Sequence, residues 1–109
     1  MRYVKVAPRF RVVEAQPDGV FLEWITENGD IIEFLEVGLN WHSVGALRKA
    51  LNQSPVVWRN NDDTLRISDA GSDLRLSFRV LSGTDTWLDL VLAAPEAAQF
   101  LATLADMTP

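Results

Sequence analysis

The only histidine of the chain, His42, is followed by Ser43, and this pair is the first candidate for chemistry. A serine nucleophile needs a base that takes its proton, and no other imidazole is present to serve as that base. Neighbouring residues on a helix point about 100° apart, so the two side chains would not face each other. We therefore interpret His42 as an exposed residue at the start of a helix, beside a capping serine.

Three carboxylates are the other candidates for catalysis or metal binding. Asp62 and Asp63 follow two asparagines, a pattern that is typical of a turn and brings no third ligand. Glu33 interrupts an apolar row, where a buried carboxylate could act as a general acid. The alternative places Glu33 at a sheet margin or beside a basic residue such as Lys49 or an arginine. Because the chain has no cysteine, thiolate metal sites are excluded. We expect a protein that is not an enzyme and has no catalytic residues, metal or cofactor.

A row of arginines around an indole is the best candidate for a ligand site. Arginines can follow phosphates while an exposed indole stacks on a base, so the row could bind single-stranded nucleic acid or another anion. The alternative is an ordinary solvated sheet face, on which Arg79 pairs with Asp89 or lies over Trp87. The net charge of −5 and the aspartates in the flanking turns disfavour nucleic acid. The row consists of Arg66, Arg75, Arg79 and Trp87.

The clearest structural signature is a hairpin formed by residues 20–26 and 31–37. Its Asn28-Gly29 sequence predicts a two-residue type I′ turn, because both central positions need a positive φ. That turn places Trp24 opposite Glu33.

Both faces of this hairpin are apolar, whereas a hairpin with one wet face alternates between apolar and polar residues. A helix can cover the first face, which contains Trp24. The second face needs another sheet, such as one formed by residues 56–92, or another protein. We expect this second face to be an interface for a homo-oligomer or a protein partner. It carries Phe21, Ile25, Ile32 and Phe34, with Glu23 and Glu36 beside them.

Length and composition indicate a single α+β domain over residues 1–109. A chain of 109 residues can bury about two-thirds of its unfolded surface, and 48% hydrophobic with 23% charged residues is typical of globular proteins. No apolar run approaches the ~20 residues that span a bilayer, and Met1–Lys5 lacks the apolar core of a secretion signal. We expect a cytoplasmic protein without membrane association.

Charge is distributed unevenly along the first third of the chain. Residues 1–13 hold four bases and no acid, whereas residues 14–36 hold seven acids and no base. This asymmetry could steer a charged partner toward the protein. The alternative is local pairing, in which a basic first strand lies beside an acidic second strand.

The remaining patterns predict an α+β fold of about seven antiparallel strands and two helices, in the order βββα-ββββα with the second helix C-terminal. The first strand covers residues 4–12 and is an edge or bends at Pro8. One helix covers Trp41–Leu51 and the other opens at Pro95. The patterns leave open whether the strands form one coiled sheet or two packed sheets. Further strands are predicted at residues 56–60, 64–68, 74–81 and 86–92.

This order of elements is similar to that of the PUR and whirly nucleic-acid-binding domains, a resemblance of topology without a shared motif. It implies the alternative function, nucleic-acid binding on a sheet face. The residues themselves favour a non-catalytic interaction module.

The faces of the last two strands also constrain the connection between them. Leu76 and Leu90 share a buried face only if paired residue numbers sum to an even value. The sequence therefore predicts a three- or five-residue connection, with Gly83 supplying a positive φ or a bulge.

Overall fold

The structure is a computed structural model that describes residues 2–81 and 85–109. It contains two successive units of four strands and one helix, and each set of four strands forms an antiparallel sheet in chain order. The α+β class and the two helices are confirmed, and the strands form two sheets rather than one coiled sheet. The first unit comprises β1 (Tyr3–Ala7), β2 (Phe10–Ala15), β3 (Gly19–Asn28), β4 (Ile31–Asn40) and α1 (Trp41–Leu51). The second comprises β5 (Val57–Arg59), β6 (Leu65–Ala70), β7 (Asp73–Val80), β8 (Thr86–Leu92) and α2 (Ala94–Met107).

The predicted first strand is in fact a hairpin, so the described residues form eight strands in the order ββββα-ββββα. Pro8 has no amide to donate and Arg9 adopts a left-handed φ of 60°, which together turn the chain between β1 and β2. The β1–β2 register shifts between Lys5 and Ala7, at a bulge. The extra residue keeps the even-numbered side chains of both strands on one face. The alternation of apolar and polar side chains therefore continues across the turn, and the sequence of this hairpin has the pattern of a single strand.

The β3–β4 hairpin forms, but its register differs from the prediction by two residues. Asn28 pairs with Ile31, so the two-residue loop is Gly29-Asp30. Gly29 has a φ of +64°, and a glycine at the first central position is typical of a type II′ turn. Trp24 consequently pairs with Leu35, and Glu33 lies opposite Thr26 close to the turn of the hairpin. A shift of two residues leaves every side chain on its predicted face.

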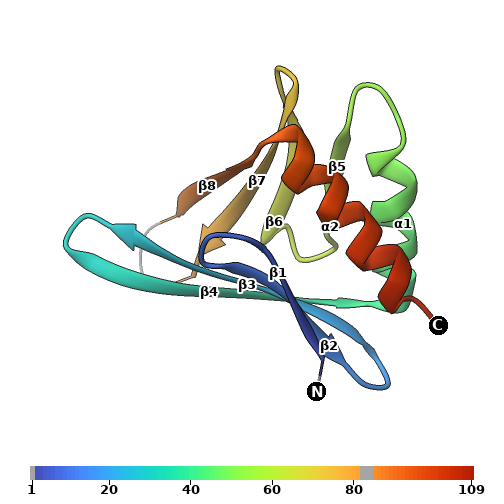
Figure 1. The fold of residues 1–109 in the computed structure, drawn as a ribbon. Coiled ribbons are helices and arrows are strands. Elements are labelled where there is room, and N and C mark those ends of the chain that lie inside the picture. Colours follow the sequence, from blue (N-terminus) through green and yellow to red (C-terminus); the bar gives the residue numbers. More distant parts are fainter. Residues whose placement is uncertain (1, 82–84) are drawn as a thin grey trace.

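The two sheets pack through their inner faces, with the helices at one end. Figure 1 shows the first sheet at the bottom of the view, the second above it and both helices to the right. The ring of Phe78 on β7 lies 5.4 Å from Trp24 and 6.4 Å from Phe10, measured between centroids. Phe100 of α2 packs 5.8 Å from Phe10. One continuous apolar core thus joins residues of both units.

The helices begin where their capping residues predict. The Asn40 side chain accepts a hydrogen bond of 2.8 Å from the Ser43 amide, which caps α1. The Glu96 carboxylate accepts one of 2.9 Å from the Ala93 amide, and α2 begins one residue before Pro95. No helix in the described ranges has the length and apolar character needed to cross a membrane.

The β7–β8 register confirms the parity argument. Leu76 pairs with Leu90, and Val80 with Thr86, which brackets a five-residue connection. The prediction for Gly83 lies outside the described residues.

Candidate interaction faces

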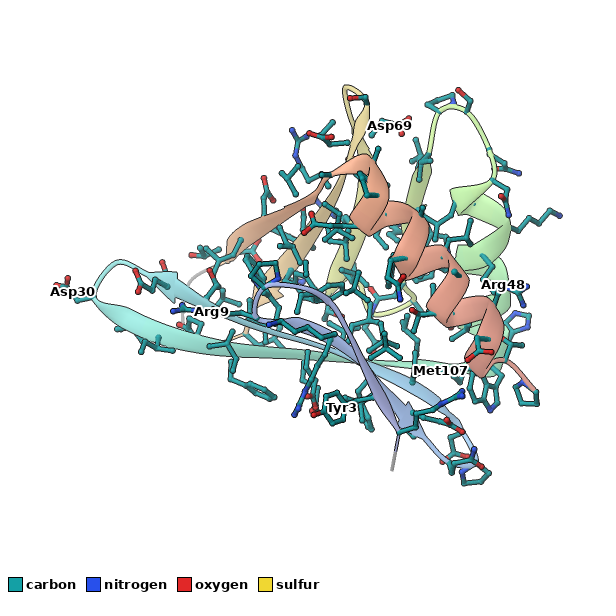
Figure 2. The ribbon with its side chains drawn as sticks, in the orientation of Figure 1. Tyr3, Arg9, Asp30, Arg48, Asp69 and Met107 are labelled. Atoms are coloured by element: carbon teal, nitrogen blue, oxygen red, sulfur yellow. The ribbon has the colours of Figure 1, made fainter. Side chains whose placement is uncertain are left out.

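The outer face of the first sheet carries large apolar side chains that none of the described residues covers. The side chains of Ile32 and Phe34 on β4 are 70% and 54% exposed, and Phe21 and Ile25 on β3 are 36% and 41% exposed. Figure 2 shows Tyr3, which is 59% exposed, on the side of this sheet that faces away from α2. The structure therefore gathers the four predicted interface residues on one face and adds Tyr3 to them.

The expectation that this face could be covered within the chain is wrong. The sheet formed by β5–β8 packs on the opposite, inner face of the β3–β4 hairpin, where Phe78 contacts Trp24. The helices also pack from the inner side, with Val44 and Leu47 of α1 fully buried. The hairpin has one dry face and one wet face, although both are apolar.

A single row of charges crosses the outer face between its apolar residues. In this row Lys5 of β1 lies beside Arg11 of β2, then Glu23 of β3 and Glu36 of β4. The Arg11 Nε lies 2.6 Å from the Glu23 Oε1. Lys5 and Glu36, at the two ends, form no ion pair with any described residue. Partial burial, together with a hydrogen bond and charge repulsion from Glu23, raises the pKa of Glu36.

The cross-strand alternative for the uneven charge is confirmed for two pairs. Arg2 contacts Glu14 at 3.0 Å and Arg11 contacts Glu23 at 2.6 Å, so basic residues near the N-terminus pair with the acidic segment that follows. Arg9 has no ion-pair partner among the described residues and borders a hollow of about 390 Å³ on the outer face. The hollow is lined by residues of all four strands, among them Ile25 and Phe34.

The outer face of the second sheet brings together the predicted arginine row. The Arg66 guanidinium lies 4.1 Å from the Trp87 ring centroid and that of Arg79 lies 6.0 Å from it. Trp87 is half-buried beneath these groups rather than exposed. Arg75 belongs to the same face, opposite Ser68 and Val91.

Each arginine of this row also has an aspartate partner. Arg66 donates two hydrogen bonds, of 2.9 and 2.7 Å, to Asp63, and these bonds lower the pKa of Asp63. Arg79 lies 2.6 Å from Asp85, and Arg75 lies 3.8 Å from Asp89. Of the two arrangements expected for Arg79, its position over Trp87 is observed and its pair with Asp89 is not, because Asp89 accepts a hydrogen bond from Ser77 and faces Arg75. The face is consequently close to neutral.

Among the candidate catalytic residues, Glu33 and Asp62 border one cleft, whereas His42 and Asp63 do not line it. Glu33 is half-exposed on the edge strand β4, and the cleft, of about 400 Å³, lies between the two sheets. It forms no ion pair with Lys49 or with any described arginine. His42 is exposed on α1, and Asp63 is bound to Arg66. Within residues 2–81 and 85–109 no three metal-ligating side chains cluster together.

The sequence places Glu36 beside the interface residues but does not align Lys5 with it. Because the sequence predicts residues 4–12 as one strand, it does not show that Lys5 lies on an outer strand beside Arg11. Tyr3 was missed for the same reason, although its odd parity with Lys5 and Arg11 is a usable signal.

Comparison with known proteins adds nothing to the fold and site geometry. Neither protein-family models, nor curated proteins, nor solved structures give a match to this chain. The topological similarity to PUR and whirly domains therefore has no support from these comparisons.

Proposed function

We propose that this protein is a non-catalytic interaction module that docks against another protein through the outer face of its first sheet. The observation that carries the proposal is the uncovered set Phe21, Ile25, Ile32 and Phe34. Large exposed apolar patches with polar rims are typical of protein interfaces, and Ile25, Ile32 and Phe34 lie together on one side of the charge row, with Phe21 on its other side. The occupant is either a second copy of the chain or a different protein.

The test uses a photoreactive amino acid placed on each outer face in turn. At position 25 it occupies the apolar patch of the first sheet, and at position 75 it occupies the second sheet as a matched control. Irradiation of the purified protein and of its native cells should give discrete adducts from position 25. Phe34→Lys should abolish those adducts. Adducts that are equal from both positions, or that persist with Phe34→Lys, would refute the proposal.

The alternative function, binding of single-stranded nucleic acid or another anion, has one supporting observation. Arg66 stacked on Trp87 at 4.1 Å resembles the platforms on which bases stack. The three aspartate partners oppose it, because a phosphate would have to displace Asp63, Asp85 or Asp89. Filter binding of labelled oligonucleotides at two salt concentrations tests it. Retention that falls as salt rises would support nucleic-acid binding, and absence of retention at low salt would exclude it.

A further inference from the structure

We infer that the occupant of the outer face of the first sheet is a second copy of this chain, related by a two-fold axis parallel to the strands between β2 and β3. The inference rests on the proposed function and names the partner. It is carried by the order of charges across the four strands.

The charge row divides the face into a basic half and an acidic half. Lys5 and Arg11 stand on β1 and β2, whereas Glu23 and Glu36 stand on β3 and β4 at the same height along the strands. Charges of opposite sign on facing surfaces favour one docking orientation over the others. The basic residues on β1 and β2 of one copy can therefore face the acidic residues on β3 and β4 of another copy.

Symmetry decides which strands can meet. A two-fold axis parallel to the strands keeps each row at its own height and reverses the strand order. Under this axis β1 faces β4 of the second copy, so Lys5 faces Glu36 in both directions. An in-plane axis perpendicular to the strands would place β4 on β4, with carboxylate facing carboxylate. Aligned packing of two such sheets is also the common arrangement of sheet sandwiches.

The same axis gives partners to the two charges that lack them. Lys5 and Glu36 have no ion-pair partner among the described residues of a single chain. In the dimer they form two symmetric pairs at the margins of the interface. At the centre of the interface, Arg11 of each copy faces Glu23 of the other copy, beside the Arg11–Glu23 pair within each chain. These four side chains form a cluster in which positive and negative charges alternate.

The shape of the face agrees with this arrangement. The hollow of about 390 Å³ is lined by residues of all four strands and has Tyr3 and Lys5 of β1 on one side and Phe34 of β4 on the other. Phe34 projects from β4 and is 54% exposed. The rotation brings β4 of the second copy over β1, which places a projecting aromatic opposite the hollow.

Charge reversal tests the arrangement through one pair of substitutions. Lys5→Glu gives a chain with glutamate at both ends of the row, and Glu36→Lys gives one with lysine at both ends. Each single variant should weaken the homodimer about tenfold or more at 50 mM salt, as read by light scattering across concentration. A 1:1 mixture of the two should recover a dimer, because both contacts are then of opposite charge.

Two controls separate this result from loss of structure. Arg59→Glu reverses an exposed strand cation on the second sheet and should leave the dimer unchanged. Circular dichroism melting should show that both single variants remain folded. Recovery in the mixture cannot be explained by damage to either chain.

The outcomes distinguish the inference from the proposed function. A wild-type dimer that is unaffected by both reversals, or a mixture that stays monomeric, would overturn the two-fold arrangement while leaving the docking face in place. A monomeric wild type would overturn the second copy as occupant. The photoreactive probe at position 25 then decides whether another protein binds the face.

Discussion

The ring of Phe21 lies over Gly38 on the neighbouring strand, so that a Cβ added to Gly38 would stand 3.1 Å from the Phe21 Cε1. The two residues pair across β3 and β4 on the outer face of the first sheet. Because the ring has solvent on its other side, it can tilt away from an added methyl group. The aromatic surface of this face therefore depends on a glycine beneath it.

Two glycine substitutions should differ sharply in their effect on stability. Gly38→Ala should change the free energy of unfolding by less than about 1 kcal/mol, since the Phe21 ring can move and alanine suits a strand better than glycine. Gly19→Ala should cost more than about 2 kcal/mol, because its Cβ would stand 1.8 Å from the Leu39 backbone oxygen. Urea denaturation of both variants checks this, and equal effects would contradict the close backbone approach at Gly19.

The two sides of the first sheet should respond differently to loss of an aromatic ring. Phe78→Ala removes a fully buried side chain from the core between the sheets and should lower the free energy of unfolding by about 3–5 kcal/mol. Phe34→Ala should cost below about 1 kcal/mol in the monomer but weaken association. Thermal melting combined with light scattering separates the two effects. A large loss of monomer stability with Phe34→Ala would mean that this ring belongs to the core.

Glu36 should make monomer stability depend on pH. Its pKa is raised in the folded state, mainly by burial and then by Glu23, so its ionisation opposes folding. The penalty is absent below about pH 4 and grows as the pH rises through the folded-state pKa.

Glu36→Gln should therefore stabilise the monomer at pH 7, by about 0.5 kcal/mol after allowance for solvent screening at this exposed site. The gain should disappear near pH 3. The measurement is urea denaturation at both pH values in a Phe34→Lys background, which removes any contribution of association. A gain that is the same at both pH values would contradict an electrostatic cause.

Arg66 should stabilise the second sheet through both of its contacts. Arg66→Ala removes the cation–π contact with Trp87 and two hydrogen bonds to Asp63, and should lower the free energy of unfolding more than loss of a neighbouring unpaired arginine does. Arg66→Lys should recover little, because an ammonium cannot make the bidentate contact.

Arg59→Ala provides a matched control for this prediction. Arg59 pairs with Arg66 across β5 and β6, is exposed, and forms no ion pair with the described residues. Its loss should change stability by a few tenths of a kcal/mol. Acrylamide quenching should increase for Arg66→Ala alone, because Trp87 loses its cover. Equal quenching in the two variants would count against that contact.

The face on which each strand residue lies could be predicted, because side chains alternate between the two faces and a register error of two residues leaves that alternation unchanged. The Asn28-Gly29 signal is compatible with either of two turn types, which differ by two residues in the pairing that they impose. The partner of Trp24 was therefore wrong, yet Phe21 and Phe34 kept their place on one face. The same logic brought Arg66, Arg79 and Trp87 together.

Features that depend on bulges and turns could not be predicted. The bulge in β1 preserves the alternation of side chains, and so conceals the turn at Pro8 and Arg9. The ion pairs of Arg66 and Arg79 involve Asp63 and Asp85, which stand in connections whose backbone course the sequence does not specify. Together with the Arg75–Asp89 pair, these two pairs make the outer face of the second sheet close to neutral.

The mass of the wild-type protein as a function of concentration tests the central claim most directly. One chain has a mass of 12.2 kDa. Light scattering should give twice that mass at high micromolar concentration, falling toward the chain mass on dilution, and Phe34→Lys should remain at the chain mass throughout. A wild-type protein that stays at 12.2 kDa at every concentration would contradict association of two copies through Phe21, Ile25 and Phe34.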